Sequence, residues 1–197
     1  FEAGMIIDAS VISIHPSVHY EVVIGNKVAG NFDKPIICES KDAYKSKENF
    51  YLLMEYIIKM SKYAGIKVIV ENISSEFANT YPFGKNDFFE LFEQFPGIGM
   101  LLDVEHARHS GNLYELLELN GNIVELHLHD SGILSDGSKR GHFPIESPSY
   151  FEPLIKLLEK DSIVYVFEHG GDVTEREIIK EKKLFEGVLS KQKKQSR

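Results

Sequence analysis

At 197 residues with 43% hydrophobic side chains, the chain is long enough to bury a core, and one domain is the default for this size. No run reaches the ~18 apolar residues of a membrane span, the first residues lack the pattern of a signal peptide, and the lone Cys38 excludes an intrachain disulfide. We therefore expect a soluble, cytoplasmic protein, and the net charge of −8 makes nucleic acid an unfavourable partner.

Five short runs of mostly apolar residues predict β-strands. Strands that are apolar at consecutive positions are covered on both faces, which favours a parallel sheet over a half-solvated antiparallel one. The predicted strands span residues 10–15, 66–71, 99–103, 123–129 and 163–168.

Helical spacing appears between these strands. Apolar residues of 47–64 recur on one face, and Gly65 follows as a C-terminal cap; the pattern returns from Phe88 to Phe95. Two S/T-x-x-E capping boxes predict the starts of later helices, one at Ser149 and one at Thr174. The alternation predicts an α/β fold built of βα units, with a single domain over 1–190 and a basic tail over 191–197.

Each predicted strand ends in, or beside, a residue able to bind a cation. In parallel sheets and barrels these ends meet at one face. Any one of these residues could be an ordinary polar boundary residue, but three neighbouring carboxylates would be costly to bury unless a cation balanced them. The strand-end residues are His15, Glu71, Asp103, His127 or His129, and Glu168.

The motifs at these ends resemble those of the xylose isomerase-like TIM barrel superfamily. In chain order they are "HPS", "VIVENI", "LLDVEHARHSG", "ELHLHDS", "GHFPI" and "VYVFEHGG". The superfamily contains sugar phosphate isomerases/epimerases and the endonuclease IV-like enzymes of AP endonuclease family 2. The resemblance implies a TIM (β/α) barrel. The motifs match only the last five βα units of a complete barrel, which has about 250 residues.

Two explanations of the shorter length stay open. The chain is either a fragment or an open, partial barrel. An open barrel would cover its free edges by association, for example as a homo-oligomer.

The resemblance also implies a metal site. By motif position, one divalent ion would be held by Glu71, Asp103, His127 and Glu168, and the two glutamates would also act as the catalytic acid/base pair. His127 is preferred to His129 because its offset to Asp130 reproduces the H-x-x-D spacing, although both histidines face the same side of the strand. Oxygen-rich ligation with one imidazole suits Mn²⁺, Mg²⁺ or Zn²⁺.

Further residues are expected to contact the substrate. Arg140 stands where the family's D-x-H element has aspartate, so a trinuclear zinc site would lose that ligand unless Asp136 replaced it. Surface or supporting positions are expected for His19, His109 and His169. The expected substrate-binding residues are His15, His106, His129, His142 and Arg140.

Three functions follow. The favoured one is a metal-dependent sugar or sugar-phosphate isomerase/epimerase, which moves a proton next to a carbonyl while a cation stabilises the developing charge. The second is an endonuclease IV-like abasic-site repair enzyme, disfavoured by the acidic charge and by Arg140. The third is a non-catalytic barrel fragment that binds a ligand or partner.

Overall fold

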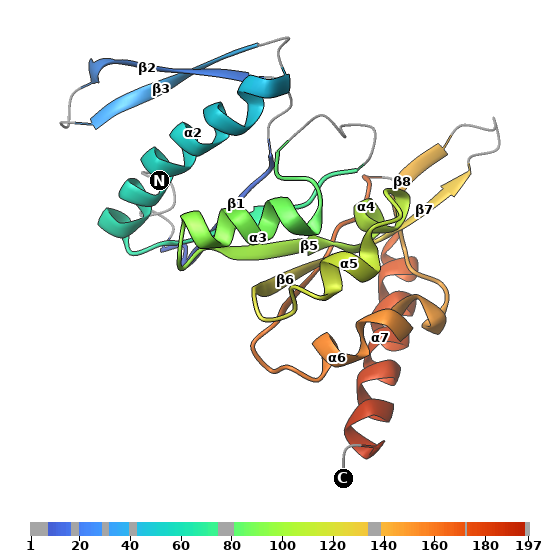
Figure 1. Cartoon of the computed structure of the whole chain (residues 1–197). Helices are drawn as coiled ribbons and strands as arrows, with labels where there is room; N and C mark the ends of the chain where they lie inside the picture. Colours follow the sequence, from blue (N-terminus) through green and yellow to red (C-terminus); the bar gives the residue numbers. More distant parts are fainter. Residues whose placement is uncertain are drawn as a thin grey trace. The chain divides into compact units, whose positions relative to one another are not determined.

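The computed structural model describes residues 8–16, 20–28, 32–39, 43–74, 81–133, 139–171 and 173–195. The chain divides into two compact units, Phe1–Leu101 and Leu102–Arg197, coloured blue to green and green to red in Figure 1. No helix within the described residues is long and apolar enough to cross a membrane.

The first unit contains strands of two kinds. Strand β4 pairs in parallel with β1 and with β5, and β2 pairs with β3 as an antiparallel hairpin. Helix α2 packs against β2 and β4, and Figure 1 shows it beside the hairpin. The elements are β1 (Val11–Ile14), β2 (Tyr20–Val28), β3 (Phe32–Glu39), α2 (Ala43–Ala64), β4 (Lys67–Glu71), α3 (Lys85–Gln94) and β5 (Gly99–Asp103), the last of which ends in the second unit.

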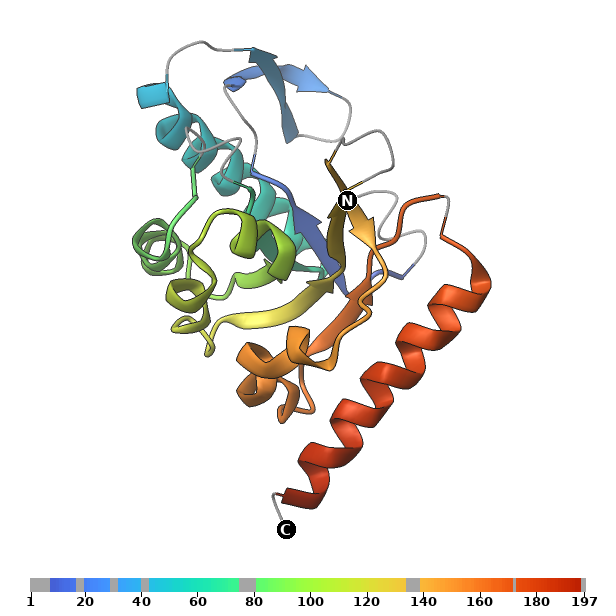
Figure 2. The same cartoon turned by 90° about the vertical axis from the view of Figure 1, so that its right-hand side faces the viewer.

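The second unit carries the remaining elements. Strands β6 and β9 pair in parallel, β7 and β8 form an antiparallel hairpin, and the strand order of the main sheet is β1-β4-β5-β6-β9. Figure 2 shows α7 as one continuous helix. The elements are α4 (Val104–His109), α5 (Leu113–Leu117), β6 (Ile123–Leu128), β7 (Asp130–Ile133), β8 (Lys139–Phe143), the 3₁₀ helix η2 (Pro148–Leu154), α6 (Ile155–Leu158), β9 (Val164–Phe167) and α7 (Glu175–Gln195).

All five predicted strands are confirmed, each within one residue at either end, as β1, β4, β5, β6 and β9. Both hairpins were missed. In β2 the sequence mixes apolar and charged residues, and in β7 and β8 glycines interrupt short polar runs, so neither showed the continuous apolar pattern used to find strands.

The predicted helix ends have mixed outcomes. Gly65 has φ 69°, the left-handed conformation expected of a C-terminal cap. At α7, Thr174 and Glu177 exchange the predicted bonds, with the Thr174 N–H 2.8 Å from Glu177 Oε2. The Ser149 capping box is wrong: Ser147 caps η2 and accepts from the Ser149 N–H, because Pro148 is preorganised for the first helical position.

Each unit has its own buried apolar side chains. In the first, Phe88 and Leu91 of α3 are fully buried, as the predicted apolar face requires. In the second, α7 packs through Phe185, whose ring lies 5.3 Å from that of Phe151 and 5.2 Å from that of Phe167. This aromatic cluster holds α7 against the end of β9, next to Glu168.

Candidate functional site

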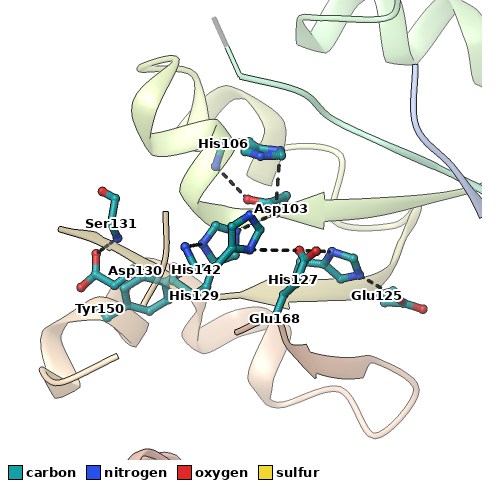
Figure 3. Close-up of polar contacts among 10 residues, drawn as sticks. All are labelled: Asp103, His106, Glu125, His127, His129, Asp130, Ser131, His142, Tyr150 and Glu168. Carbon is teal, nitrogen blue, oxygen red and sulfur yellow. Dashed lines mark hydrogen bonds and ion pairs between the residues drawn. The ribbon is translucent and has the colours of Figure 1, made fainter. Parts of the chain in front are cut away.

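The second unit gathers polar side chains from the end of β5, from β6, from the β7–β8 hairpin and from the residue after β9 (Figure 3). The centre of one group is a buried pair. His129 Nε2 donates to Asp103 Oδ2 over 3.1 Å, and neither side chain is more than 1% exposed. Asp103 also caps α4, because its Oδ1 accepts from the backbone N–H of His106 at 2.8 Å.

Both ring nitrogens of His129 are engaged. While Nε2 donates to Asp103, Nδ1 accepts from the backbone N–H of His142 at 3.2 Å. The carbonyl of His129 accepts from the Tyr150 hydroxyl at 2.8 Å. His129 is therefore held in one orientation and has no ring nitrogen to spare for a further ligand.

The pair shifts both pKa values. Burial alone would raise the pKa of Asp103, but the hydrogen bond from His129 and the nearby imidazoles lower it below its ordinary value. Burial lowers the pKa of His129, whereas the Asp103 carboxylate raises it, and the net shift is upward. Protonation of Nδ1 would nevertheless cost the bond from His142.

His127 occupies the centre of a second group. Its Nε2 lies 3.3 Å from Glu125 Oε1, and its buried Nδ1 has no hydrogen bond among the described residues. Oε2 of Glu168 lies 3.3 Å from that Nδ1. With Nε2 donating to Glu125, the Nδ1 lone pair and the Glu168 carboxylate face each other, an arrangement that a proton or cation between them would stabilise.

His142 brings a second imidazole to Glu168. Its Nδ1 lies 3.7 Å from Glu168 Oε2, and its ring stacks on that of His129 with centroids 4.3 Å apart. The residue has φ 62°, which is unusual for a side chain other than glycine. The hairpin backbone is thus held in an uncommon conformation that presents this ring to Glu168.

Two groups of potential metal donors in the second unit both include His129, one of whose ring nitrogens would have to give up its present hydrogen bond to bind a cation. In each, every residue offers one ligand atom within 4.8 Å of the others. Imidazole nitrogen and carboxylate oxygen are the donors that Zn²⁺ and Mn²⁺ accept. The groups are His129, His142 and Glu168, and Asp103, Glu105, His106 and His129.

The remaining predicted residues belong to the first unit, lack a described side chain or fall outside the described residues. Glu71 ends β4 in the first unit, where it is 8% exposed, and His15 follows β1 in the same unit. Arg140 lies in β8 opposite Gly132, but its side chain is not among those described. His19 and Asp136 fall outside the described residues.

Sequence reasoning missed two polar partners. Glu125 lies two residues before His127 on β6, and the period-2 alternation of a strand could have placed both on one face. Glu181, in α7, is only 2% exposed and contacts His169. It left no signal in the sequence, because a glutamate within a charged helix is ordinarily solvated.

No protein-family model and no curated protein matches the chain. Solved structures do. A D-tagatose 3-epimerase-like protein matches over 100% of this chain and 68% of its own, with 22% identity and a TM-score of 0.63. An IolI protein with a bound zinc atom matches over 96% and 66%, with 18% identity and a TM-score of 0.58.

A third match is a xylose isomerase-like TIM barrel protein from Mycobacterium smegmatis in complex with magnesium. The match spans 97% of this chain and 64% of the magnesium-bound protein, with 12% identity and a TM-score of 0.58. The predicted fold class is thereby confirmed: the chain has the fold of xylose isomerase-like TIM barrel proteins and spans about two thirds of the length of these structures.

Proposed function

We propose that this chain supplies the site of a metal-dependent sugar or sugar-phosphate isomerase/epimerase. The observation that carries the proposal is the approach of His127 Nδ1 to Glu168 Oε2, 3.3 Å apart, with no hydrogen bond to that nitrogen from the part of the chain that the structure describes. Support for the substrate class comes from the fold, which the chain shares with a D-tagatose 3-epimerase-like protein.

The residues of the second unit fit a divalent cation. Two lone-pair donors facing each other are unfavourable until positive charge lies between them. Glu125 contacts the other nitrogen of His127, as carboxylates commonly do for metal-binding histidines. Within the second unit we assign Asp103, His127 and Glu168 as ligands and His129 as a residue that orients Asp103, and Glu71 stays the fourth ligand that the sequence motif predicts.

The cation, when bound, would polarise the substrate carbonyl and stabilise the negative charge that develops on its oxygen. Glu168 would remove the proton from the adjacent carbon, and its side chain, 44% exposed, is open to a substrate. Glu71 would serve as the second acid/base residue. His106 and His142, both partly exposed, would donate hydrogen bonds to substrate hydroxyls.

The test combines metal analysis with a panel of sugars and sugar phosphates in deuterated water. We expect about one Mn²⁺, Mg²⁺ or Zn²⁺ per chain and metal-dependent exchange of the carbon-bound proton. A protein that binds metal and incises abasic DNA, but exchanges no sugar proton, would replace this function with that of a repair nuclease. A protein that binds no metal would contradict the proposal and leave a non-catalytic barrel fragment.

A further inference from the structure

Helix α7 packs against the rest of the second unit partly through an unusual buried residue. Among the side chains of α7 that are described, only Glu181 and Phe185 are buried. They lie one turn apart and therefore share a face of the helix. Phe185 is a normal apolar anchor. Glu181 places a carboxylate, 2% exposed, where an apolar side chain would be the cheaper choice.

Glu181 joins two segments that carry site residues. Its Oε1 accepts from the backbone N–H of Ile145 at 2.6 Å, and its Oε2 lies 2.6 Å from His169 Nε2. Ile145 lies two residues beyond the end of β8, the strand that carries His142, and His169 directly follows Glu168. One carboxylate thus holds both of the segments that bring His142 and Glu168 together.

The backbone strengthens this connection. The N–H of Gly170 donates to the carbonyl of His142 at 3.0 Å, so the two segments also contact each other directly. The His169 ring stacks against that of Phe167 with centroids 6.3 Å apart. The His169 side chain therefore contacts both an aromatic ring and Glu181, although its Nε2 makes no hydrogen bond among the described residues, and these contacts restrict the segment that carries Glu168.

We propose that Glu181 is a positioning residue for Glu168, acting from α7 through His169 and through the segment at Ile145. The inference rests on the proposed function for its chemical purpose, since Glu168 is there a ligand and a base. It assigns no direct contact of Glu181 with metal or substrate. The expected consequence is that loss of Glu181 weakens metal binding more than it weakens the fold.

The variants are Glu181→Ala, which removes both contacts, and Glu181→Gln, which keeps an acceptor for the Ile145 N–H. Glu186→Gln is the matched control, because Glu186 lies on the same helix with an exposed side chain. Calorimetric titration of the whole chain with Mn²⁺ should show an affinity about 10- to 100-fold lower for Glu181→Ala. Glu181→Gln should recover most of that loss, and Glu186→Gln should bind as the wild type does.

A second measurement does not require metal. Imidazole NMR signals of His127 and His142 in the metal-free protein at one pH should move in Glu181→Ala and stay in place in Glu186→Gln. If Glu181→Ala does not fold, His169→Ala takes its place in both measurements, with the same direction expected. A folded variant with wild-type affinity and unmoved imidazole signals would overturn the inference. If the wild type binds no metal, the proposed function fails, whereas the NMR comparison still decides the role of Glu181.

Discussion

Asp103 and His129 form a hydrogen bond of 3.1 Å from which solvent is excluded. Because His142 donates to the other ring nitrogen, a backbone group, an imidazole and a carboxylate form one continuous chain of bonds. Such a chain fixes the direction of Asp103 Oδ2 before any ligand arrives, which reduces the reorganisation that binding would require.

The lowered pKa of Asp103 predicts a specific pH dependence of stability. A carboxyl group whose pKa is lower in the folded state stabilises the fold above its ordinary pKa, and this contribution is lost as pH falls through the folded value. The free energy of unfolding of the metal-free protein should therefore fall on acidification below about pH 4. Urea unfolding between pH 2.5 and 7 would measure it.

Asp103→Asn should make the free energy of unfolding depend less on pH below about pH 4 and should lower it at neutral pH. The matched control is Asp161→Asn, at an exposed position, which should leave the pH dependence of the unfolding free energy unchanged. If the unfolding free energy of Asp103→Asn falls as steeply with acidification as that of the wild type, other groups cause the pH dependence.

Glu168→Gln should separate catalysis from binding. Glutamine keeps the size and one oxygen donor but cannot remove a proton, so turnover of a sugar substrate should fall about 10²- to 10⁴-fold while metal affinity changes less. Asp103→Asn should lower both together, since only a ligand role is assigned to it. Turnover and calorimetric affinity would be measured on the same preparations, and undiminished turnover in Glu168→Gln would exclude it as the base.

His127 and His129 should respond differently to substitution. His127→Ala removes a proposed ligand, whereas Glu125→Gln removes only the carboxylate that orients it, so the second should lose about 10- to 100-fold in metal affinity and the first more. His129→Ala should mainly lower the unfolding temperature, because it removes the donor that His129 Nε2 provides to the buried Asp103 Oδ2. The opposite ranking of His127 and His129 in metal titrations would make His129 the ligand.

Removing metal should destabilise the protein. A ligand that binds only the folded state at 100 times its dissociation constant adds about 2.7 kcal/mol to stability. A chelator should therefore lower the melting temperature, and added Mn²⁺ or Zn²⁺ should restore it. Calorimetry with Ca²⁺-saturated chelator as the control would measure the change, and an unchanged melting temperature would contradict the metal site.

The cap of α7 offers a test of local structure alone. Thr174→Ala removes the side-chain oxygen 3.4 Å from the Glu177 N–H, so stability should fall by about 1 kcal/mol, without an effect on metal affinity. Thr174→Ser keeps the oxygen and should stay close to the wild type. Equal stability of the alanine and serine variants in urea unfolding would show that the cap contributes nothing.

The sequence by itself determined the positions of the main strands and the residues at their ends. Burial on both faces demands continuous apolar runs, and such runs are local, so the buried strands β4 and β5 could be located without knowing their neighbours. Apolar runs located β6 and β9 as well, although β9 is only partly buried, with Val164 52% exposed. The Thr174 cap is equally local, because its partners lie three residues apart.

Tertiary structure alone decided which of these side chains meet. His127 and His129 look alike in the sequence. Only the positions of Glu125, Asp103 and the His142 backbone distinguish them: Nδ1 of His127 has no hydrogen bond among the described residues, whereas both ring nitrogens of His129 are bonded. The same holds for Glu181, which contacts Ile145 from 36 positions away. Hydrogen bonds act between atoms about 3 Å apart whatever their separation in sequence, so periodicity along the chain carries no record of them.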